Sequence, residues 1–311
     1  MADSTPFHSG EVAVVGRPNV GKSTLVNRLV GEKVAIVSEK PQTTRKRVLG
    51  VARVPGAEIA LVDTPGIHRP HFRMNAAMVR DATDALATAD LVLWIVDASE
   101  KAGKGDAFIL GLLERAGSPA ILALNKIDLV SKERLLPMIA DFSARHAFAG
   151  IVPISAKTGD GIERLARLLA ENLPEGEPAY PEDFLTSMPE TEWIAEVIRE
   201  KLLQRTREEL PFASAVVIES VKENQEKDLT VVTASIVVER EGQKGIVVGR
   251  GGSMIRDIGT AAREELEREA GRHFFLDLYV KVREGWRNDE RFLSRLVSDP
   301  GGPKSRVPGP E

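Results

Sequence analysis

A stretch of nine residues near the N-terminus has the residue types and spacing needed to hold phosphate groups. Residues 16–24 read GRPNVGKST and fit G-x-x-x-x-G-K-[ST], between the apolar run 11–15 and a helical pattern. Glycines let backbone N–H groups turn toward phosphates, and the start of a helix adds a favourable dipole. We expect Lys22 to reach the β- and γ-phosphates and the Ser23 hydroxyl to ligate Mg²⁺. By itself this loop predicts a nucleotide without saying which one.

A second motif, DTPG at residues 63–66, follows the apolar run 59–63. The Asp63 carboxylate can reach Mg²⁺ through a water molecule, and the Gly66 N–H can point at the γ-phosphate. A tight turn has the same composition. Its position after the strand that follows the phosphate loop favours the functional interpretation.

The tetrapeptide NKID at residues 125–128 predicts which base is bound. The Asp128 carboxylate can accept hydrogen bonds from guanine N1–H and the N2 amino group together. Adenine lacks this pair of donors and would leave the carboxylate unpaired, and sites built on such contacts reject the wrong partner strongly. We expect Asn125 to brace the loops and contact the purine edge, and the stem of Lys126 to cover one ring face.

The tripeptide SAK at 155–157 ends the last strand of this region, where the Ala156 N–H can donate to guanine O6. Four motifs in this order, each after a strand, resemble the P-loop GTPases, whose ligands lie at the carboxyl ends of parallel strands. The predicted nucleotide-binding residues are Gly16, Asn19, Val20, Gly21, Lys22, Ser23, Thr24, Asp63, Gly66, Asn125, Lys126, Asp128, Ser155, Ala156 and Lys157.

The segment KPQTTRKRVLG at 40–50 has no apolar periodicity. In P-loop GTPases this loop carries a threonine that closes on Mg²⁺ and the γ-phosphate and is released on hydrolysis. We choose Thr44, with Thr43 as the alternative; a solvated basic loop is the other interpretation. The metal ligands implied are Ser23, Thr44 and Asp63, the last through water.

Many GTPases place a glutamine after the equivalent of Gly66 to orient the attacking water. Here the residue is Ile67, a hydrocarbon, so we expect slow intrinsic hydrolysis. In related GTPases with an asparagine in the P-loop, that residue helps to bind a potassium ion that acts like an arginine finger. The resemblance therefore adds K⁺ to Mg²⁺ and GTP or GDP as a candidate cofactor. The predicted catalytic residues are Lys22, Asn19, Thr44 and Gly66.

A second glycine motif lies in IVVGRGGSMIRDIG at 246–259. It fits G-x-x-G between a strand-like run and an amphipathic helix, in a locally basic stretch. In KH domains such a loop clamps about four nucleotides of single-stranded RNA. The predicted RNA-binding residues are Lys244, Gly249, Arg250, Gly251, Gly252, Ser253 and Arg256.

The elements around these motifs divide the chain in two. Residues 10–172 alternate apolar strands with helices, which predicts a mainly parallel sheet with helices on both faces and a hairpin at Pro55-Gly56. Four prolines within 173–190 indicate a linker. Residues 191–297 follow the order α-β-β-α-β of a smaller α+β domain, a type II KH fold whose additional helix has to fit within EGQKGIVVGR. We expect residues 1–9 to be flexible and 298–311 to be disordered.

Composition narrows the class of protein. The 311 residues contain no cysteine, which fits a reducing compartment, and neither a secretory signal nor an apolar run of membrane-spanning length is visible. We therefore expect a cytoplasmic location. The formal net charge of −4 gives no sign of nucleic-acid binding, so that expectation depends on the local surface of the second domain.

The motifs together resemble one family, the Era family of bacterial GTPases with a C-terminal KH domain. The matching segments are GRPNVGKST, PQTTR, DTPGIH, NKID, SAK, ELPF, VVGRGGSMIRDIG and DLYVKVREGWR, which span residues 10–297. The resemblance implies a ribosome-assembly GTPase that binds the 3′ end of 16S rRNA and the 30S subunit, with no small-molecule substrate except GTP. It also raises peripheral association with the inner membrane face, for which the sequence offers only amphipathic helices.

Two other functions stay open at this point. One is an RNA-binding KH protein whose GTPase domain holds nucleotide structurally; the intact Lys22, Ser23 and Asp63 argue against it. The other is a signalling GTPase that docks a protein partner through the second domain.

Overall fold

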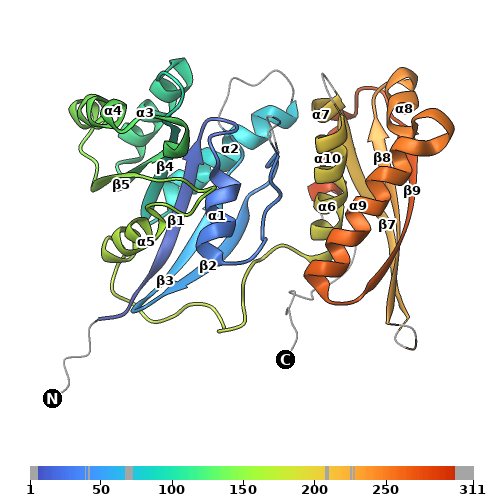
Figure 1. The fold of residues 1–311 in the computed structure, drawn as a ribbon, viewed down its shortest axis with the longest axis horizontal. Coiled ribbons are helices and arrows are strands. Elements are labelled where there is room, and N and C mark those ends of the chain that lie inside the picture. The colour runs from blue at the N-terminus through green and yellow to red at the C-terminus, as the bar shows by residue number, and fades with distance from the viewer. Residues whose placement is uncertain are drawn as a thin grey trace. The chain divides into compact units, whose positions relative to one another are not determined.

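The computed structural model divides into two compact units, and the main boundary along the chain lies between Ser187 and Met188 (Figure 1). It describes residues 6–38, 40, 43–66, 73–206, 210–224, 226 and 228–297. Ile67 and most of the two expected flexible tails, 1–5 and 298–311, lie outside the described residues.

The first unit is built on a six-stranded sheet of order β2-β3-β1-β4-β5-β6. Only β2 runs antiparallel, as a hairpin with β3, and the other neighbours pair in parallel. This confirms the predicted sheet and its hairpin. The strands are β1 (His8–Gly16), β2 (Val48–Val54), β3 (Ala57–Asp63), β4 (Leu91–Asp97), β5 (Ala120–Asn125) and β6 (Gly150–Pro153).

Helices cover both faces of this sheet, because alternate residues of its strands are apolar on opposite sides. In β4, Leu93 and Ile95 pack in one core with α1 and α5, whereas Val92 and Trp94 pack in the other with α2, α3 and α4. Trp94 and Phe142 meet edge to face, with ring centroids 5.5 Å apart. The helical elements are α1 (Lys22–Val30), α2 (Arg73–Thr88), α3 (Lys104–Ala116), η1 (Ile127–Leu129), α4 (Lys132–Arg145) and α5 (Ile162–Glu171).

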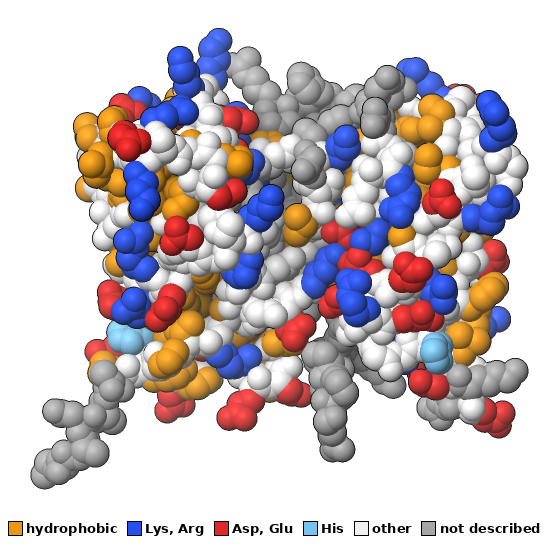
Figure 2. Space-filling view, in the orientation of Figure 1, with side chains coloured by type: hydrophobic (Ala, Val, Ile, Leu, Met, Phe, Trp, Pro, Cys, Tyr) orange, Lys and Arg blue, Asp and Glu red, His pale blue; other side chains and the backbone are white. Residues whose placement is uncertain are grey.

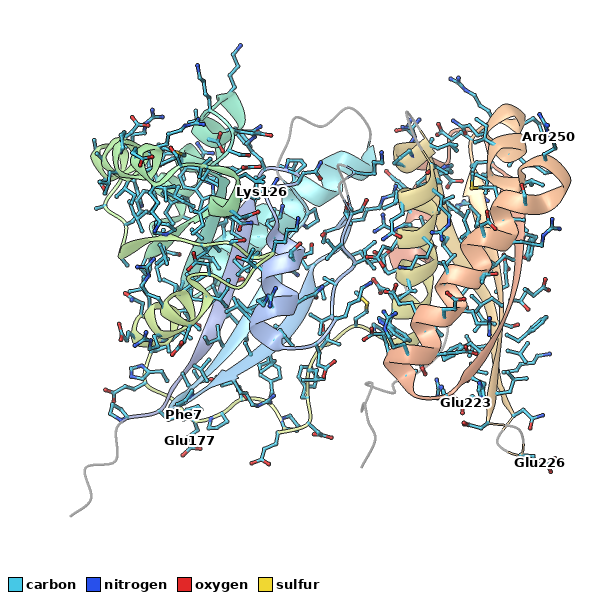
Figure 3. The ribbon with its side chains drawn as sticks, viewed as in Figure 1. Phe7, Lys126, Glu177, Glu223, Glu226 and Arg250 are labelled. Carbon is cyan, nitrogen blue, oxygen red and sulfur yellow. The ribbon has the colours of Figure 1, made fainter. Side chains whose placement is uncertain are left out.

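The chain after α5 pairs with the first unit. The Gly176 N–H donates to Phe7 O at 3.0 Å and the Ser9 N–H to Pro174 O at 3.1 Å, so β1 starts at His8, earlier than the expected end of a flexible N-terminus at residue 9. Figure 3 labels Phe7 and Glu177 beside each other at this end of the sheet.

The same segment also covers the free edge of β2. The Val51 N–H donates to Leu185 O at 2.9 Å, and the Ser187 N–H donates to Leu49 O at 3.3 Å. The segment expected to be a linker is therefore held against the sheet as far as residue 187. Prolines exclude a helix or a central strand here, but they do not prevent a segment from capping an edge strand.

A buried carboxylate on β3 fixes this segment. Glu58 is buried, and its Oε1 accepts hydrogen bonds from the N–H groups of Ala179 at 2.7 Å and Tyr180 at 3.2 Å. Its Oε2 lies 3.2 Å from the Arg53 guanidinium, which also donates to Phe184 O at 3.0 Å. The Glu58 carboxylate therefore accepts two backbone hydrogen bonds and forms an ion pair with Arg53.

Replacing Glu58 with alanine is expected to destabilise the first unit by about 2–3 kcal/mol, because two backbone donors and Arg53 lose their acceptor. Urea unfolding measures the loss, and hydrogen exchange of the Ala179 and Tyr180 amides should accelerate together. The exposed Glu177 supplies the control, since its replacement by alanine should change neither quantity. Unchanged protection of both amides in the Glu58→Ala variant would contradict this role.

The second unit is a three-stranded sheet of order β7-β8-β9, with β7 and β8 antiparallel and β8 and β9 parallel. This confirms the predicted KH-type order. The elements are α6 (Glu190–Arg205), α7 (Leu210–Ala213), β7 (Ser214–Asn224), β8 (Leu229–Val238), α8 (Glu241–Val248), η3 (Arg250–Gly252), α9 (Ser253–Ala270), β9 (His273–Val282), η4 (Trp286–Asn288) and α10 (Glu290–Val297).

The run 246–248 before the second glycine motif was predicted to be strand-like, but the structure shows that it is helical. It forms the last turn of α8, which is the short helix expected within EGQKGIVVGR. The Gln243 side chain accepts from the N–H groups of Glu239 at 2.9 Å and Arg240 at 3.1 Å, and Val247 is fully buried. Capping and burial therefore override the strand preference of its valines.

Helix α9 faces the interior of the second unit through Ile258, Ala262 and Leu266, which are buried. Of the aromatic pair at the start of β9, Phe274 is buried and Phe275 is exposed, as alternation along a strand requires. Within the part of the chain that the structure describes, no helix has the length and apolar character needed to cross a membrane.

Candidate functional site

The four motifs of the first unit meet at one edge of the sheet. Residues 16–24, 63–66, 125–128 and 155–157 follow β1, β3, β5 and β6, which are all parallel, so their carboxyl ends point the same way. Figure 3 labels Lys126 at this edge, opposite the end where Phe7 lies. The sheet therefore brings together the residues that the sequence predicts for phosphate and base recognition.

At the phosphate end of the site lies a buried ammonium group. Lys22 Nζ donates to the carbonyls of Gly16 at 3.3 Å and Arg17 at 3.1 Å. Burial lowers the pKa of Lys22 to about 8, and the nearby carboxylate of Asp63 offsets only part of this effect. A phosphate group in the loop would supply the missing negative charge and move this pKa upward again.

Three oxygen-bearing side chains converge next to Lys22. Ser23 Oγ donates to Asp63 Oδ2 at 2.7 Å, Thr44 Oγ1 donates to the same oxygen at 3.3 Å, and the two hydroxyl oxygens lie 2.8 Å apart. Burial raises the pKa of Asp63, and its other oxygen, Oδ1, is buried with no hydrogen-bond partner among the residues that the structure describes. Hydroxyl and carboxylate oxygens are the donors that Mg²⁺ prefers, so this set fits that ion.

The two candidate threonines differ in what their hydroxyls contact. Thr44 Oγ1 lies on Ser23 and Asp63, whereas Thr43 Oγ1 donates to Lys40 O at 2.6 Å. The geometry therefore favours Thr44 over Thr43 as the residue that faces the metal position.

At the base end, Asn125 ties the loops together. Its Nδ2 donates to Val20 O at 2.7 Å, and its Oδ1 accepts from the Ala156 N–H at 2.9 Å. A Cβ at Gly21, which has φ +98°, would lie 2.3 Å from Asn125 Nδ2, so only glycine leaves room for this contact. The expected bracing role thus has a direct geometric basis.

The groups expected to contact guanine also form hydrogen bonds with one another, which the sequence did not indicate. Ser155 Oγ donates to Asp128 Oδ1 at 2.6 Å, which fixes the carboxylate that should face the base. The Ala156 N–H, expected to donate to guanine O6, is already directed at Asn125 Oδ1. The SAK loop therefore holds the side chains of Asn125 and Asp128, through the Ala156 N–H and the Ser155 hydroxyl.

The remaining predicted residues lie in or beside the same loops. Asn19 has φ 65°, a left-handed conformation that asparagine tolerates better than most residues. A Cβ at Gly66 would lie 2.9 Å from Pro18, so the DTPG turn touches the phosphate loop. Val20 is buried, and Thr24 lies in the first turn of α1.

Three charged residues that the sequence interpretation did not single out support this site. Arg17 pairs with Glu100 at 2.7 Å and Asp106 at 3.1 Å. Arg28 donates to the carbonyls of Ala156 at 3.2 Å and Lys157 at 2.6 Å. Asp97 pairs with Lys126 at 2.6 Å. Only Asp97 had a sequence signal, an acidic residue that ends a buried strand.

The second glycine motif forms an exposed turn before α9. Gly249 has φ +73°, and a Cβ there would lie 2.7 Å from the backbone N of Met254. Arg250, Gly251, Ser253 and Arg256 are exposed, whereas Lys244 lies on α8 with its Nζ 4.0 Å from Glu241. Of the charged side chains that Figure 2 shows at the end of this unit where Figure 3 labels Arg250, most are Lys and Arg, and Glu223 and Glu226 are labelled at the opposite end.

Comparisons with known proteins find a matching family model in each of the two units. A family model described as a 50S ribosome-binding GTPase matches residues 11–126, and a KH domain model matches 209–287. The GTPase Era of Geobacter metallireducens is 48% identical over 296 residues, which cover 95% of this chain and 99% of the relative. The chain belongs to the Era family.

Solved Era structures have the same fold over nearly their whole length. The crystal structure of a single-residue variant of Aquifex aeolicus Era bound to GDP.AlF4⁻ matches with a TM-score of 0.90 at 40% identity, and covers 93% of this chain and 99% of its own. An Era structure in complex with MgGDPNP and nucleotides 1506–1542 of 16S ribosomal RNA matches with a TM-score of 0.91 at 40% identity, over 93% of this chain and 98% of its own. As an Era-family member, the protein is a GTPase.

Proposed function

We propose that this Era-family GTPase binds the 3′ end of 16S rRNA through its KH domain and uses GTP hydrolysis to time binding and release during assembly of the small (30S) ribosomal subunit. The observation that carries the proposal is the presence in one chain of a guanine-type P-loop site and a G-x-x-G turn. An Era structure at 40% identity holds MgGDPNP and nucleotides 1506–1542 of 16S rRNA on the same fold. The proposal places the protein in the cytoplasm; peripheral membrane association has support only from amphipathic helices.

The residues of the second unit support the RNA half of this proposal. The turn at Gly249–Gly252 leads directly into α9, whose first N–H groups can face a phosphate. The exposed guanidinium groups of Arg250 and Arg256 add charge-assisted donors for the sugar–phosphate backbone. Glycine at 251 and 252 lets that backbone approach closely.

GTP hydrolysis by the full-length protein is expected to rise when an oligonucleotide of the 16S rRNA 3′ end is added. Replacing both Gly251 and Gly252 with aspartate should abolish the rise and leave the basal rate intact, because two negative charges and two side chains then oppose the RNA backbone. Steady-state phosphate release with and without the oligonucleotide measures the effect. No stimulation of the native protein would contradict the coupling.

The matched control for this experiment lies at the other end of α9. Gly251 and Gly271 both have positive φ, 60° and 67°, and in both cases an added Cβ meets no atom of the described residues within 4 Å. Gly251→Asp should therefore weaken the stimulation, whereas Gly271→Asp imposes a similar strain and charge and should retain it. Equal loss in the two variants would indicate a general effect of aspartate on the domain.

We also propose that potassium accelerates hydrolysis through Asn19. The Asn19 side chain lies in the phosphate loop between Gly16 and Gly21, and the residue directly after Gly66 is Ile67 in place of a glutamine. A cation held there would stabilise the negative charge that develops on the phosphates during transfer.

The rate of hydrolysis at saturating GTP should be about tenfold or more higher in KCl than in NaCl at equal ionic strength. Asn19→Gly should remove most of this difference, and glycine is suitable because it accepts the φ of 65° at this position. Equal rates of the native protein in the two salts would count against a potassium site.

A further inference from the structure

Asp97 is a buried carboxylate at the carboxyl end of β4, next to the guanine-recognition loop. It is 4% exposed. Its Oδ2 lies 2.6 Å from Lys126 Nζ, and its Oδ1 accepts from the Ser99 N–H at 2.9 Å and the Ser99 hydroxyl at 2.6 Å. Both carboxylate oxygens are therefore committed, one to a lysine of the NKID motif and one to a local turn.

The backbone places Asp97 directly beside that motif. Asp97 pairs in register with Asn125 across β4 and β5, and the next N–H, that of Ala98, donates to Asn125 O at 2.8 Å. Lys126 itself has φ 65°, a conformation that costs energy for a residue with a long side chain. The two ends of Lys126 are thus held separately, its backbone by the loop and its ammonium group by Asp97.

The pair is a charged one. Burial alone would raise the pKa of Asp97, but hydrogen bonds from Lys126 and Ser99 outweigh burial and hold the pKa below its ordinary value. Asp97 is therefore ionised at neutral pH, and the bond to Lys126 is of the strong, charge-assisted kind. The Lys126 side chain remains about one third exposed, at 32%, although its ammonium group is paired with Asp97.

We propose that Asp97 is a positioning residue for the guanine nucleotide, which holds the ammonium group of Lys126 so that the four-carbon stem presents a fixed apolar surface to one face of the purine ring. A free lysine loses rotamer freedom worth about 2 kcal/mol when it is immobilised. Fixing it before the nucleotide arrives removes part of this cost from binding. The inference rests on the proposed role of Lys126 at the base and is independent of the RNA proposal.

The test compares GDP binding by the full-length protein and by Asp97→Asn, with a fluorescent GDP analogue as the probe. The variant should bind about tenfold more weakly, mainly through faster dissociation. The value of kcat at saturating GTP should change less than twofold, because Asp97 acts at the purine ring and not at the phosphates. IDP, which lacks the N2 amino group, should lose affinity by the same factor as GDP, because the ring face and not its edge is affected.

A double-mutant cycle separates positioning from a structural role. In a Lys126→Ala background, Asp97→Asn should cause no further loss of GDP affinity, because the side chain that it positions is absent. Ser99→Ala, which removes only the turn hydroxyl, should bind GDP like the native protein. Additive losses in the cycle, or a loss in Ser99→Ala equal to that in Asp97→Asn, would overturn the proposal.

Lys126→Met gives an answer even where Asp97→Asn does not fold, because methionine keeps an apolar stem but cannot be tethered. Its GDP affinity should lie between those of the native protein and Lys126→Ala, and native affinity would overturn the proposal. Failure of RNA stimulation leaves all of these binding results unaffected, so the two proposals fail separately.

Discussion

Replacing Asp128 with asparagine is expected to lower the affinity for GTP by about 10⁴-fold and to convert the preference of the enzyme to xanthosine triphosphate. The carboxylate can accept from guanine N1–H and the N2 amino group. Asparagine presents an NH₂ group in place of one oxygen, which opposes the amino group of guanine. Xanthine has a carbonyl at C2, and that carbonyl accepts from the new NH₂ group.

The structure supports this substitution in particular, because Ser155 Oγ holds Asp128 Oδ1 at 2.6 Å and an asparagine oxygen can take the same place. The measurement is kcat/KM for GTP and for xanthosine triphosphate with the native protein and the variant. Asp141→Asn removes an exposed carboxylate that pairs with Arg145 on α4 and should leave the preference for GTP intact. An Asp128→Asn enzyme that still prefers GTP would show that another group reads the purine edge.

Replacing Lys22 with alanine should lower kcat/KM for GTP by about 10³-fold or more. Lys22 is buried and donates to two carbonyls of the phosphate loop, so its ammonium group has a fixed position before nucleotide binds. Alanine removes both the positive charge at the phosphates and the contacts that shape the loop. Lys132→Ala, which removes an exposed lysine of α4, is the control and should retain native activity.

The Lys22→Ala variant also distinguishes between the remaining functions. Loss of hydrolysis together with loss of 30S assembly activity would agree with a GTP-driven cycle. Loss of hydrolysis with full assembly activity would favour an RNA-binding protein whose GTPase domain serves as a structural support. The far-UV circular dichroism of the variant shows whether the first unit has kept its fold.

Much of the fold and the nucleotide site could be predicted because the signals are local. The parallel strands are continuous apolar runs, and the chemistry-bearing residues follow them directly, as in 63–66 after β3 and 125–128 after β5. The turn at Pro55-Gly56 marks the hairpin of β2 and β3, which the structure contains. Each of these features depends on a few adjacent residues and a general rule of sheet topology.

Features that depend on distant partners were not predicted. The segment 173–187 has the composition of a flexible linker, yet it pairs with β2 and is fixed by Glu58, which lies 121 residues before Ala179 and accepts two N–H groups of the segment. The run 246–248 has strand-forming valines, yet it is helical because Gln243 caps the helix and Val247 enters a core. In both cases the conformation depends on the contacts of particular side chains, and secondary-structure propensity does not take such contacts into account.

The sequence by itself determined the ligand class and the order of the elements, because phosphate and guanine recognition need particular residues at fixed spacings after strands. Only the tertiary structure decided that the Thr44 hydroxyl contacts Ser23 and Asp63, that the Ala156 N–H is directed at Asn125, and that Asp97 holds Lys126. These are contacts across strands and loops, and their geometry follows from the register of the sheet. In the sequence, Lys126 is recognised only as one residue of the NKID motif. The structure shows that a buried carboxylate on the neighbouring strand, Asp97, fixes its side chain.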